Sequence, residues 1–259
     1  MHKLKVCLGK KLSLSKKIRC IDLKYDWDNF SIEEKSLLLK AEKVYFPTIH
    51  YCHLFHALKK AIYPSLNSYA LLGDKIKQTL LFKALEVPHP VTSFFLGHDR
   101  KKKILSKFAF PFIAKMPKGS SMGLGVYLIK DEKGLDRYLS QTTVAYIQEY
   151  LEVNRDIRVV ILGKEVVLSY WKEAKKGEFR TNIARGGKIN FEKVPDDAID
   201  LCLFVSKKAG IDHAGFDVIM TNSGPFIIEV NINFGKEGFR EKGLSYKKIL
   251  AKLADVGRI

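Results

Sequence analysis

Two apolar segments, residues 214–221 and 225–231, constrain the fold more than any other feature of the sequence. They flank the turn-forming residues Asn222, Ser223 and Gly224, which predicts an antiparallel β-hairpin. Because strand side chains alternate between two faces, the even-numbered residues form one apolar face, which we expect to be buried. These residues are Phe216, Val218, Met220, Phe226, Ile228 and Val230.

The opposite face of the hairpin carries acids. If the turn centres on Ser223, Asp217 lies directly opposite Glu229, and Asn231 lies two residues further on the same face, which Ile219 and Ile227 share. Like charges directly opposite one another destabilise a strand pair, but a hard cation between them removes the repulsion. We therefore predict that Asp217, Glu229 and Asn231 bind a divalent metal ion. The alternative is a solvated face with two acids, which leaves the isoleucines unexplained.

Helices and strands are predicted along most of the chain. Residues 31–43 are expected to be helical because Ser31 and Glu34 have the spacing of a capping box. The mixture of strands with flanking helices predicts the α+β class. Further helices are expected over 50–62, 73–85, 131–139, 196–209 and 245–254, and strands over 3–8, 18–23, 44–46, 91–95, 111–116, 126–129, 144–151, 156–162 and 165–171.

A glycine-serine loop, residues 117–125, follows a strand that ends in Lys115. Successive backbone N–H groups in such a loop can bind an anion. The loop contains neither a Walker A sequence nor G-x-G-x-x-G, but residues 119–123 match G-x-S-x-G. That pattern would make Ser121 a hydrolase nucleophile with His213 as its base, although the loop leads into a strand rather than a helix. A plain hairpin loop is the third interpretation.

The composition indicates a folded protein with an anionic partner. Of its 259 residues, 46% are hydrophobic, which excludes a disordered tail. The net charge of +17 attracts nucleotides, acidic peptides or nucleic acid, or merely solvates the surface. No apolar run approaches the ~18 residues of a membrane span, and the four cysteines are far apart without a CxxC pair. We expect a cytoplasmic protein in a reducing compartment, with no membrane partner.

A series of motifs within residues 67–238, about two-thirds of the chain, resembles the ATP-grasp ligases, most closely their RimK-like branch. Each motif alone is weak, but their order is specific. In chain order they are Gly73-Asp74-Lys75 with Pro88-x-Pro90-x-Thr92, the strand 112–115 with the loop 119–125, Gln148-Glu149-Tyr150-Leu151, Asp156-Ile157-Arg158, Phe179-Arg180-Thr181-Asn182 with Gly186-Gly187, and Asp217 with Glu229-Val230-Asn231.

This resemblance implies an ATP-grasp fold, in which two α/β lobes sandwich the nucleotide, preceded by a shortened amino-terminal segment. The domain boundaries that we expect are 1–66 for that segment and 67–259 for the ATP-grasp domain. Within the latter, residues 67–147 would form the lobe that carries the glycine loop, and residues 148–259 would form the metal-binding lobe. The short amino-terminal segment leaves homo-oligomer formation open.

The resemblance also implies a function, the ATP- and Mg²⁺-dependent joining of a carboxylate to an amine through an acylphosphate. Glutamate, another amino acid or an acidic peptide or carrier protein would be the substrate, and Mn²⁺ is an alternative metal. Arg180 and Asn182 would stabilise the reacting groups and contact the nucleotide, while Asp217, Glu229 and Asn231 would hold the metal. The other nucleotide-binding residues would be Lys75, Lys115, Gly119, Ser120, Ser121, Gly123, Gln148, Glu149, Tyr150, Leu151 and Asp156.

Alternatives from other functional classes stay open at this point. A basic nucleic-acid-binding protein on a non-catalytic nucleotide-binding fold predicts salt-dependent binding without ATP turnover. A serine hydrolase predicts loss of activity in Ser121→Ala. The cluster of His50, Cys52, His53 and His56 has no standard metal-site spacing and is interpreted as ordinary helix packing. After Asn231, the sequence Ile-Asn-Phe-Gly departs from the serine-proline-glycine that is common in the family, which leaves the acceptor undefined.

Overall fold

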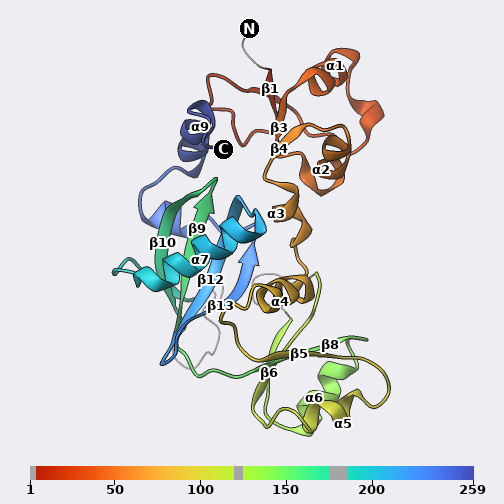
Figure 1. The fold of residues 1–259 in the computed structure, drawn as a ribbon, viewed down its shortest axis with the longest axis vertical. Helices are drawn as coiled ribbons and strands as arrows, with labels where there is room; N and C mark the ends of the chain where they lie inside the picture. The colour runs from red at the N-terminus through yellow and green to blue at the C-terminus, as the bar shows by residue number, and fades with distance from the viewer. Residues whose placement is uncertain (1–3, 120–124, 176–185) are drawn as a thin grey trace.

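The computed structural model describes residues 4–119, 125–175 and 186–259. The strands in these ranges form three sheets, which follow one another along the long axis of the molecule with helices packed against them (Figure 1). The predicted α+β class therefore agrees with the structure.

The amino-terminal sheet is parallel, with strand order β2-β1-β3-β4. The Ser31–Glu34 capping box that begins its first α-helix is confirmed. The helix predicted over 50–62 is shorter than expected, because Lys59 adopts a positive φ of 55° and a strand begins two residues later. The elements are β1 (Lys5–Leu8), β2 (Arg19–Ile21), η1 (Trp27–Asn29), α1 (Ile32–Lys40), β3 (Lys43–Tyr45), α2 (Thr48–Ala57) and β4 (Ala61–Tyr63).

A second sheet at the other end of the molecule is antiparallel, with strand order β5-β8-β6-β7 (Figure 1). Two short helices pack on it around a core of aromatic and aliphatic side chains that includes Phe112, Leu135 and Ile147. The elements are β5 (Thr92–Phe95), α5 (Arg100–Leu105), β6 (Phe112–Lys115), β7 (Val126–Ile129), α6 (Glu132–Leu139) and β8 (Ala145–Glu149).

The central sheet has five antiparallel strands in the order β11-β10-β9-β12-β13. Helix α7 covers one of its faces, with Val205 and Phe216 in the core between them. Helices α3 and α4 connect the amino-terminal sheet to β5. The elements are α3 (Leu66–Ala70), α4 (Lys75–Ala84), β9 (Arg155–Leu162), β10 (Glu165–Glu173), β11 (Lys188–Asn190), α7 (Asp196–Ala209), β12 (His213–Thr221), β13 (Gly224–Asn231), α8 (Glu237–Glu241) and α9 (Tyr246–Asp255).

The predicted hairpin is present as β12 and β13, but its turn is tighter than expected. Thr221 pairs with Gly224, so the loop contains only residues 222 and 223. Asp217 nevertheless lies opposite Glu229, as predicted. A β-bulge next to this pair accounts for the difference, because it adds one residue to β13.

The bulge reverses the predicted faces of two isoleucines. Ile227, expected beside the acids, pairs with Val218 and is fully buried in the core under α7. Ile228, expected in that core, is only half-buried. A one-residue insertion moves every following side chain to the other face of a strand, which is why simple alternation fails here.

A shared core connects the amino-terminal sheet to the rest of the molecule. Leu12 and Tyr45 pack with Leu162 of β9 and Leu250 of α9. The Tyr45 hydroxyl also donates to the backbone carbonyl of Ile259 at 3.0 Å. In the described residues no helix is long and apolar enough to cross a membrane, and all four cysteines are unpaired.

Candidate functional site

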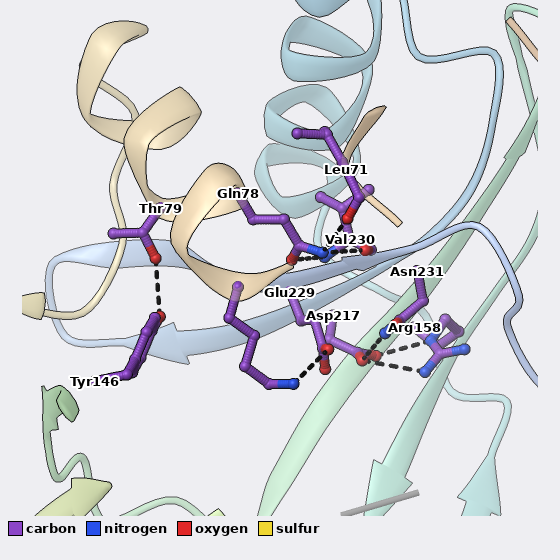
Figure 2. A network of polar contacts seen from close by, with 10 residues as sticks. Leu71, Gln78, Thr79, Tyr146, Arg158, Asp217, Glu229, Val230 and Asn231 are labelled. Carbon is purple, nitrogen blue, oxygen red and sulfur yellow. Dashed lines mark hydrogen bonds and ion pairs between the residues drawn. The ribbon is translucent and has the colours of Figure 1, made fainter. Parts of the chain in front are cut away.

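A polar row crosses the central sheet where its strands approach α4. Asp217 of β12 lies opposite Glu229 on one side and opposite Arg158 of β9 on the other. Arg158 in turn lies opposite Tyr170 of β10. The register of three strand pairs therefore places two acids and an arginine side by side, as Figure 2 shows for Asp217, Glu229 and Arg158.

Asp217 is buried and held by two cations. Arg158 donates from Nε to one carboxylate oxygen at 2.7 Å and from Nη2 to the other at 3.1 Å. The Lys172 ammonium lies 2.9 Å from the same carboxylate, and Asn231 Nδ2 lies 3.5 Å from it. Burial alone would raise the pKa of Asp217, but Arg158 and Lys172 outweigh it and bring the pKa to about 2. The carboxylate is therefore ionised at neutral pH.

A second carboxylate, that of Asp156, belongs to the same network. It lies 3.0 Å from the Lys172 ammonium, because Asp156 and Lys172 are paired across β9 and β10. Burial would lower the pKa of Lys172, but Asp156 and Asp217 raise it above its usual value. The sequence predicts that Asp156 contacts the nucleotide. In the structure, Lys172 bridges Asp156 and Asp217.

Two lysines from other elements face the acids. Lys75, the first residue of α4, is buried and lies 3.5 Å from Glu229. Lys115, the last residue of β6, is also buried. Burial, with a contribution from Lys75, lowers the pKa of Lys115 to about 8, although Glu229 and Asp217 act to raise it. The structure thus brings together Lys75, Lys115, Asp156, Asp217, Glu229 and Asn231 from five elements.

The start of the glycine loop is joined to α4. The Lys75 backbone N–H donates to the Pro117 carbonyl at 3.0 Å, and Lys118 lies 3.5 Å from Asp74, the N-cap of α4. Gly119 has a φ of 68°, which favours glycine. The remaining loop predictions, Ser120, Ser121 and Gly123, lie outside the described residues, as do Arg180 and Asn182.

The predicted nucleotide hinge lies at the end of β8. Gln148 and Glu149 use their side chains within the protein, Gln148 Nε2 donating to Thr92 Oγ1 and Glu149 Oε1 accepting from the Val91 N–H. Tyr150 and Leu151 follow the strand, and within the described chain their peptide groups make no backbone hydrogen bond. The backbone groups of these two residues are thus available to meet the edge of a ligand.

Three residues at the site received no role from the sequence, although the motif Asp156-Ile157-Arg158 contains one of them. Arg158 and Lys172 hold Asp217, and buried Gln78 of α4 clasps the Val230 peptide. Figure 2 shows the contacts of Arg158 and Gln78. Gln78 Nε2 donates to the Val230 carbonyl at 2.8 Å, and its Oε1 accepts from the Val230 N–H at 3.0 Å. Alternation along β9 places Arg158 on the face of Asp156, which was the available signal. Nothing local in the sequence indicates Gln78.

The residues of the two minor predictions are engaged elsewhere. His213 is buried between Tyr63 and Tyr246, whose hydroxyls lie 2.9 Å from Nδ1 and 3.2 Å from Nε2. In α2, the Cys52 thiol donates to the Ile49 carbonyl, and His53 and His56 point to solvent. His213 therefore serves packing between elements. In the α2 cluster the predicted packing holds for buried Cys52 but not for the exposed His50, His53 and His56.

The donor set at the hairpin fits a divalent cation next to phosphates. Within the described residues no three histidine, cysteine, aspartate or glutamate side chains are placed to hold a metal ion. Asp217 and Glu229 with the Asn231 amide are two carboxylates and a neutral oxygen, and Mg²⁺ uses such a set when phosphate oxygens complete its shell. The nearby ammonium and guanidinium groups provide the countercharge that a polyphosphate needs.

Comparison with known families matches this chain to one of them. The model of the RimK-like ATP-grasp domain matches residues 72–253. A probable alpha-L-glutamate ligase of Enterobacter sp. is 29% identical over 188 residues, which are 69% of this chain and 62% of the relative. A ribosomal protein bS6--L-glutamate ligase of Escherichia coli is 28% identical over the same shares. The chain therefore spans less than two-thirds of the length of these relatives.

Solved structures show the same fold over nearly the whole chain. A RimK domain ATP-grasp protein from Sphaerobacter thermophilus has a TM-score of 0.70 at 12% identity, covering 96% of this chain and 98% of that one. D-alanine--D-alanine ligase from Bacillus anthracis complexed with ATP has a TM-score of 0.72 at 13% identity, covering 97% and 96%. The predicted ATP-grasp fold is confirmed, and the comparisons lend no support to the nucleic-acid-binding or hydrolase alternatives.

Proposed function

This chain belongs to the RimK-like ATP-grasp family, and from that premise we propose that it joins a carboxylate to an amine at the expense of ATP. A carboxylate oxygen attacks the γ-phosphorus of ATP, ADP leaves, and an acylphosphate forms. The amine nitrogen then attacks the acyl carbon, phosphate leaves, and the nitrogen loses a proton. The observation that carries the proposal is the in-register pair Asp217–Glu229, surrounded by buried cations.

The acids and Asn231 would hold a divalent cation, which neutralises charge on the phosphates when bound. Arg158 and Lys172 keep Asp217 ionised and fix its orientation, and Lys75 forms an ion pair with Glu229. Lys75 at the start of α4 and Lys115 at the end of β6 face these acids, where they can bind phosphate oxygens. The protein thus has the charges of the site in place before its ligands arrive.

The other site residues support binding of the nucleotide and of the reacting groups. The backbone of Tyr150 and Leu151 would meet the adenine edge, while the glycine loop from Gly119 would cover the phosphates. The contacts of Arg180 and Asn182 with the acylphosphate stay predictions. The domain boundaries 1–66, 67–147 and 148–259 and a cytoplasmic location also stay predictions.

The substrates that we propose are glutamate or another amino acid, joined to an amino acid, an acidic peptide or a carrier protein. Two of the relatives are described as glutamate ligases, which supports this class. The strongly positive net charge of +17 favours an acidic partner over a neutral one.

Replacement of Glu229 by glutamine tests the proposed activity. It removes one charge and keeps the shape, so we expect ATP-dependent phosphate release with Mg²⁺ and an amino-acid panel to fall about 100-fold or more. Glu192→Gln is the matched control, because Glu192 only forms a surface pair with Arg155 at 3.7 Å. Full activity in Glu229→Gln would contradict the metal assignment, provided that its circular dichroism spectrum matches those of the parent and the control.

A further inference from the structure

Three cationic side chains converge between the amino-terminal sheet and the central sheet. Lys11 follows β1, Arg158 lies on β9, and Lys236 follows β13. Lys11 and Arg158 both lie close enough to Lys236 to lower its pKa. We call these residues the cation cluster. It adjoins the candidate active site, since Arg158 also holds Asp217.

An aromatic floor lies beneath the two lysines of the cluster. The Lys236 ammonium lies 3.3 Å from the centroid of Phe234 and 4.2 Å from that of Tyr246, and the Lys11 ammonium lies 4.5 Å from that of Phe46. The ring of His213 contacts all three of these rings. The two lysines therefore stand on one continuous aromatic surface, and Phe234 belongs to the segment that departs from the common family sequence.

The described residues provide the two lysines with no acidic partner at ion-pair distance. The Lys236 ammonium donates to the Phe234 carbonyl at 2.7 Å, and the neighbouring Glu237 lies 3.3 Å from Arg240. Burial, Lys11 and Arg158 together lower the pKa of Lys236 to about 7, although Glu237 acts to raise it. Arg158 has Asp217 as its counter-ion. Two further like charges beside it without an acidic partner are costly, unless an anion from outside completes the site.

We propose that Lys11 and Lys236 bind a substrate carboxylate that does not itself react, so that the enzyme selects substrates with a second acidic group. This inference rests on the proposed function and adds its specificity determinants. Lys11 is exposed and Lys236 is half-buried, so a ligand can reach both from solvent. A bound carboxylate would lie beside Arg158, which contacts Asp217. The rest of the substrate could then extend toward the phosphates.

Methionine substitutions test the site without removing the lysine stems. Met keeps the length of the side chain and packs well on aromatic rings, so Lys11→Met and Lys236→Met should fold. With ATP and Mg²⁺, we expect each variant to raise KM for L-glutamate at least about tenfold while kcat changes little, because a charge-assisted contact is lost. KM for L-glutamine should not change. Lys10→Met is the control, since Lys10 is exposed and forms a long surface ion pair of 3.8 Å with Asp22.

A peptide ending in glutamate, compared with one ending in glutamine, distinguishes a free amino acid from a peptide terminus as the source of the carboxylate. The source is whichever acidic compound shows the lysine-dependent KM. An unmodified enzyme that prefers the neutral compound of each pair would overturn the proposal, as would lysine variants with unchanged KM.

An activity-free measurement separates this proposal from the proposed function. Calorimetric titration of glutarate, a dicarboxylate that lacks an amine, should detect binding that both lysine variants weaken and Lys10→Met does not. If glutarate binding depends on the lysines but no amino acid of the panel gives ATP-dependent phosphate release, the anion site is supported and the ligase activity is refuted. Phosphate release with glutamate, combined with lysine-independent KM and glutarate binding, would do the opposite.

Discussion

Lys172 and Lys236 show how burial and charged neighbours together decide the protonation of a residue. Lys172 lies between Asp156 and Asp217, and its pKa is raised despite burial. Burial, and then Lys11 and Arg158, lower the pKa of Lys236 to about 7. The same side chain is thus a cation at neutral pH in one place and a titrating group in another. Lys172 supports a carboxylate, whereas Lys236 is suited to release and rebind an anion.

The pKa of Lys236 predicts how substrate capture depends on pH. Lys236 loses its proton as pH rises through about 7, so kcat/KM for an acidic substrate should fall above that pH. The charged groups that face Lys236 are Lys11, Arg158 and Glu237. Lys11 and Arg158 favour loss of its proton, and Glu237 opposes it. Arginine does not deprotonate in proteins. In Lys236→Arg the decline should therefore move to higher pH, and an identical pH profile in the two proteins would contradict the assignment.

At the scale of elements, register and helix packing build the site together. The β12–β13 bulge lets Asp217 face Glu229 and still sends Ile227 into the core. Helix α4 then fixes β13 from the side, because Gln78 satisfies both polar groups of the Val230 peptide. Val230 lies between two proposed metal ligands, Glu229 and Asn231. The clasp therefore sets the position of both ligands through the backbone that they share.

Replacement of Gln78 by leucine should weaken both stability and metal use. The variant leaves the buried N–H and C=O of Val230 without partners, which costs on the order of 2–4 kcal/mol of unfolding free energy. We also expect the Mg²⁺ concentration for half-maximal phosphate release to rise severalfold. Urea denaturation and a Mg²⁺ titration measure the two effects.

A surface substitution on the same helix is the control for Gln78→Leu. Lys77→Leu changes an exposed neighbour and should shift the unfolding free energy by only about 0.5 kcal/mol. A Gln78→Leu variant that is destabilised but needs no more Mg²⁺ would show that the clasp stabilises the fold without positioning the ligands.

At the scale of the whole molecule, one core joins the amino-terminal sheet to the central sheet. Leu12 and Tyr63 of the amino-terminal part pack in one cluster with Val160 of the central sheet and Leu250 of α9. His213 adds a polar connection, because it bonds to Tyr63 of β4 and Tyr246 of α9. The cation cluster lies at this junction and depends on it, since Lys11 and Lys236 come from opposite sides.

The two tryptophans of the chain can test this unity, because one lies in each part. Trp27 lies in η1 beside the amino-terminal sheet, and Trp171 lies in β10. In Trp27→Phe and in Trp171→Phe, the remaining tryptophan reports unfolding of its own part. We expect the fluorescence midpoint in urea to equal the circular dichroism midpoint of the same variant, as one cooperative transition requires. A separate midpoint for Trp27 would show that the amino-terminal sheet unfolds independently.

Local signals accounted for most elements and for the central pair of the site. The capping box at Ser31 and the alternation of the hairpin depend on residues a few positions apart. They fail where a distant contact decides. The partners of Asp217 on β9 and β10, and the clasp by Gln78, come from strands and a helix that sequence spacing cannot align.

By itself, the sequence determined the class of the fold, the family and the acids that face each other on the hairpin, because motif order and side-chain alternation are properties of the chain. Only the tertiary structure decided which cations neutralise those acids, which isoleucine enters the core, and that Lys11 meets Lys236. The physical reason is that register, bulges and the docking of sheets are set by contacts between segments far apart in sequence, which local periodicity does not encode.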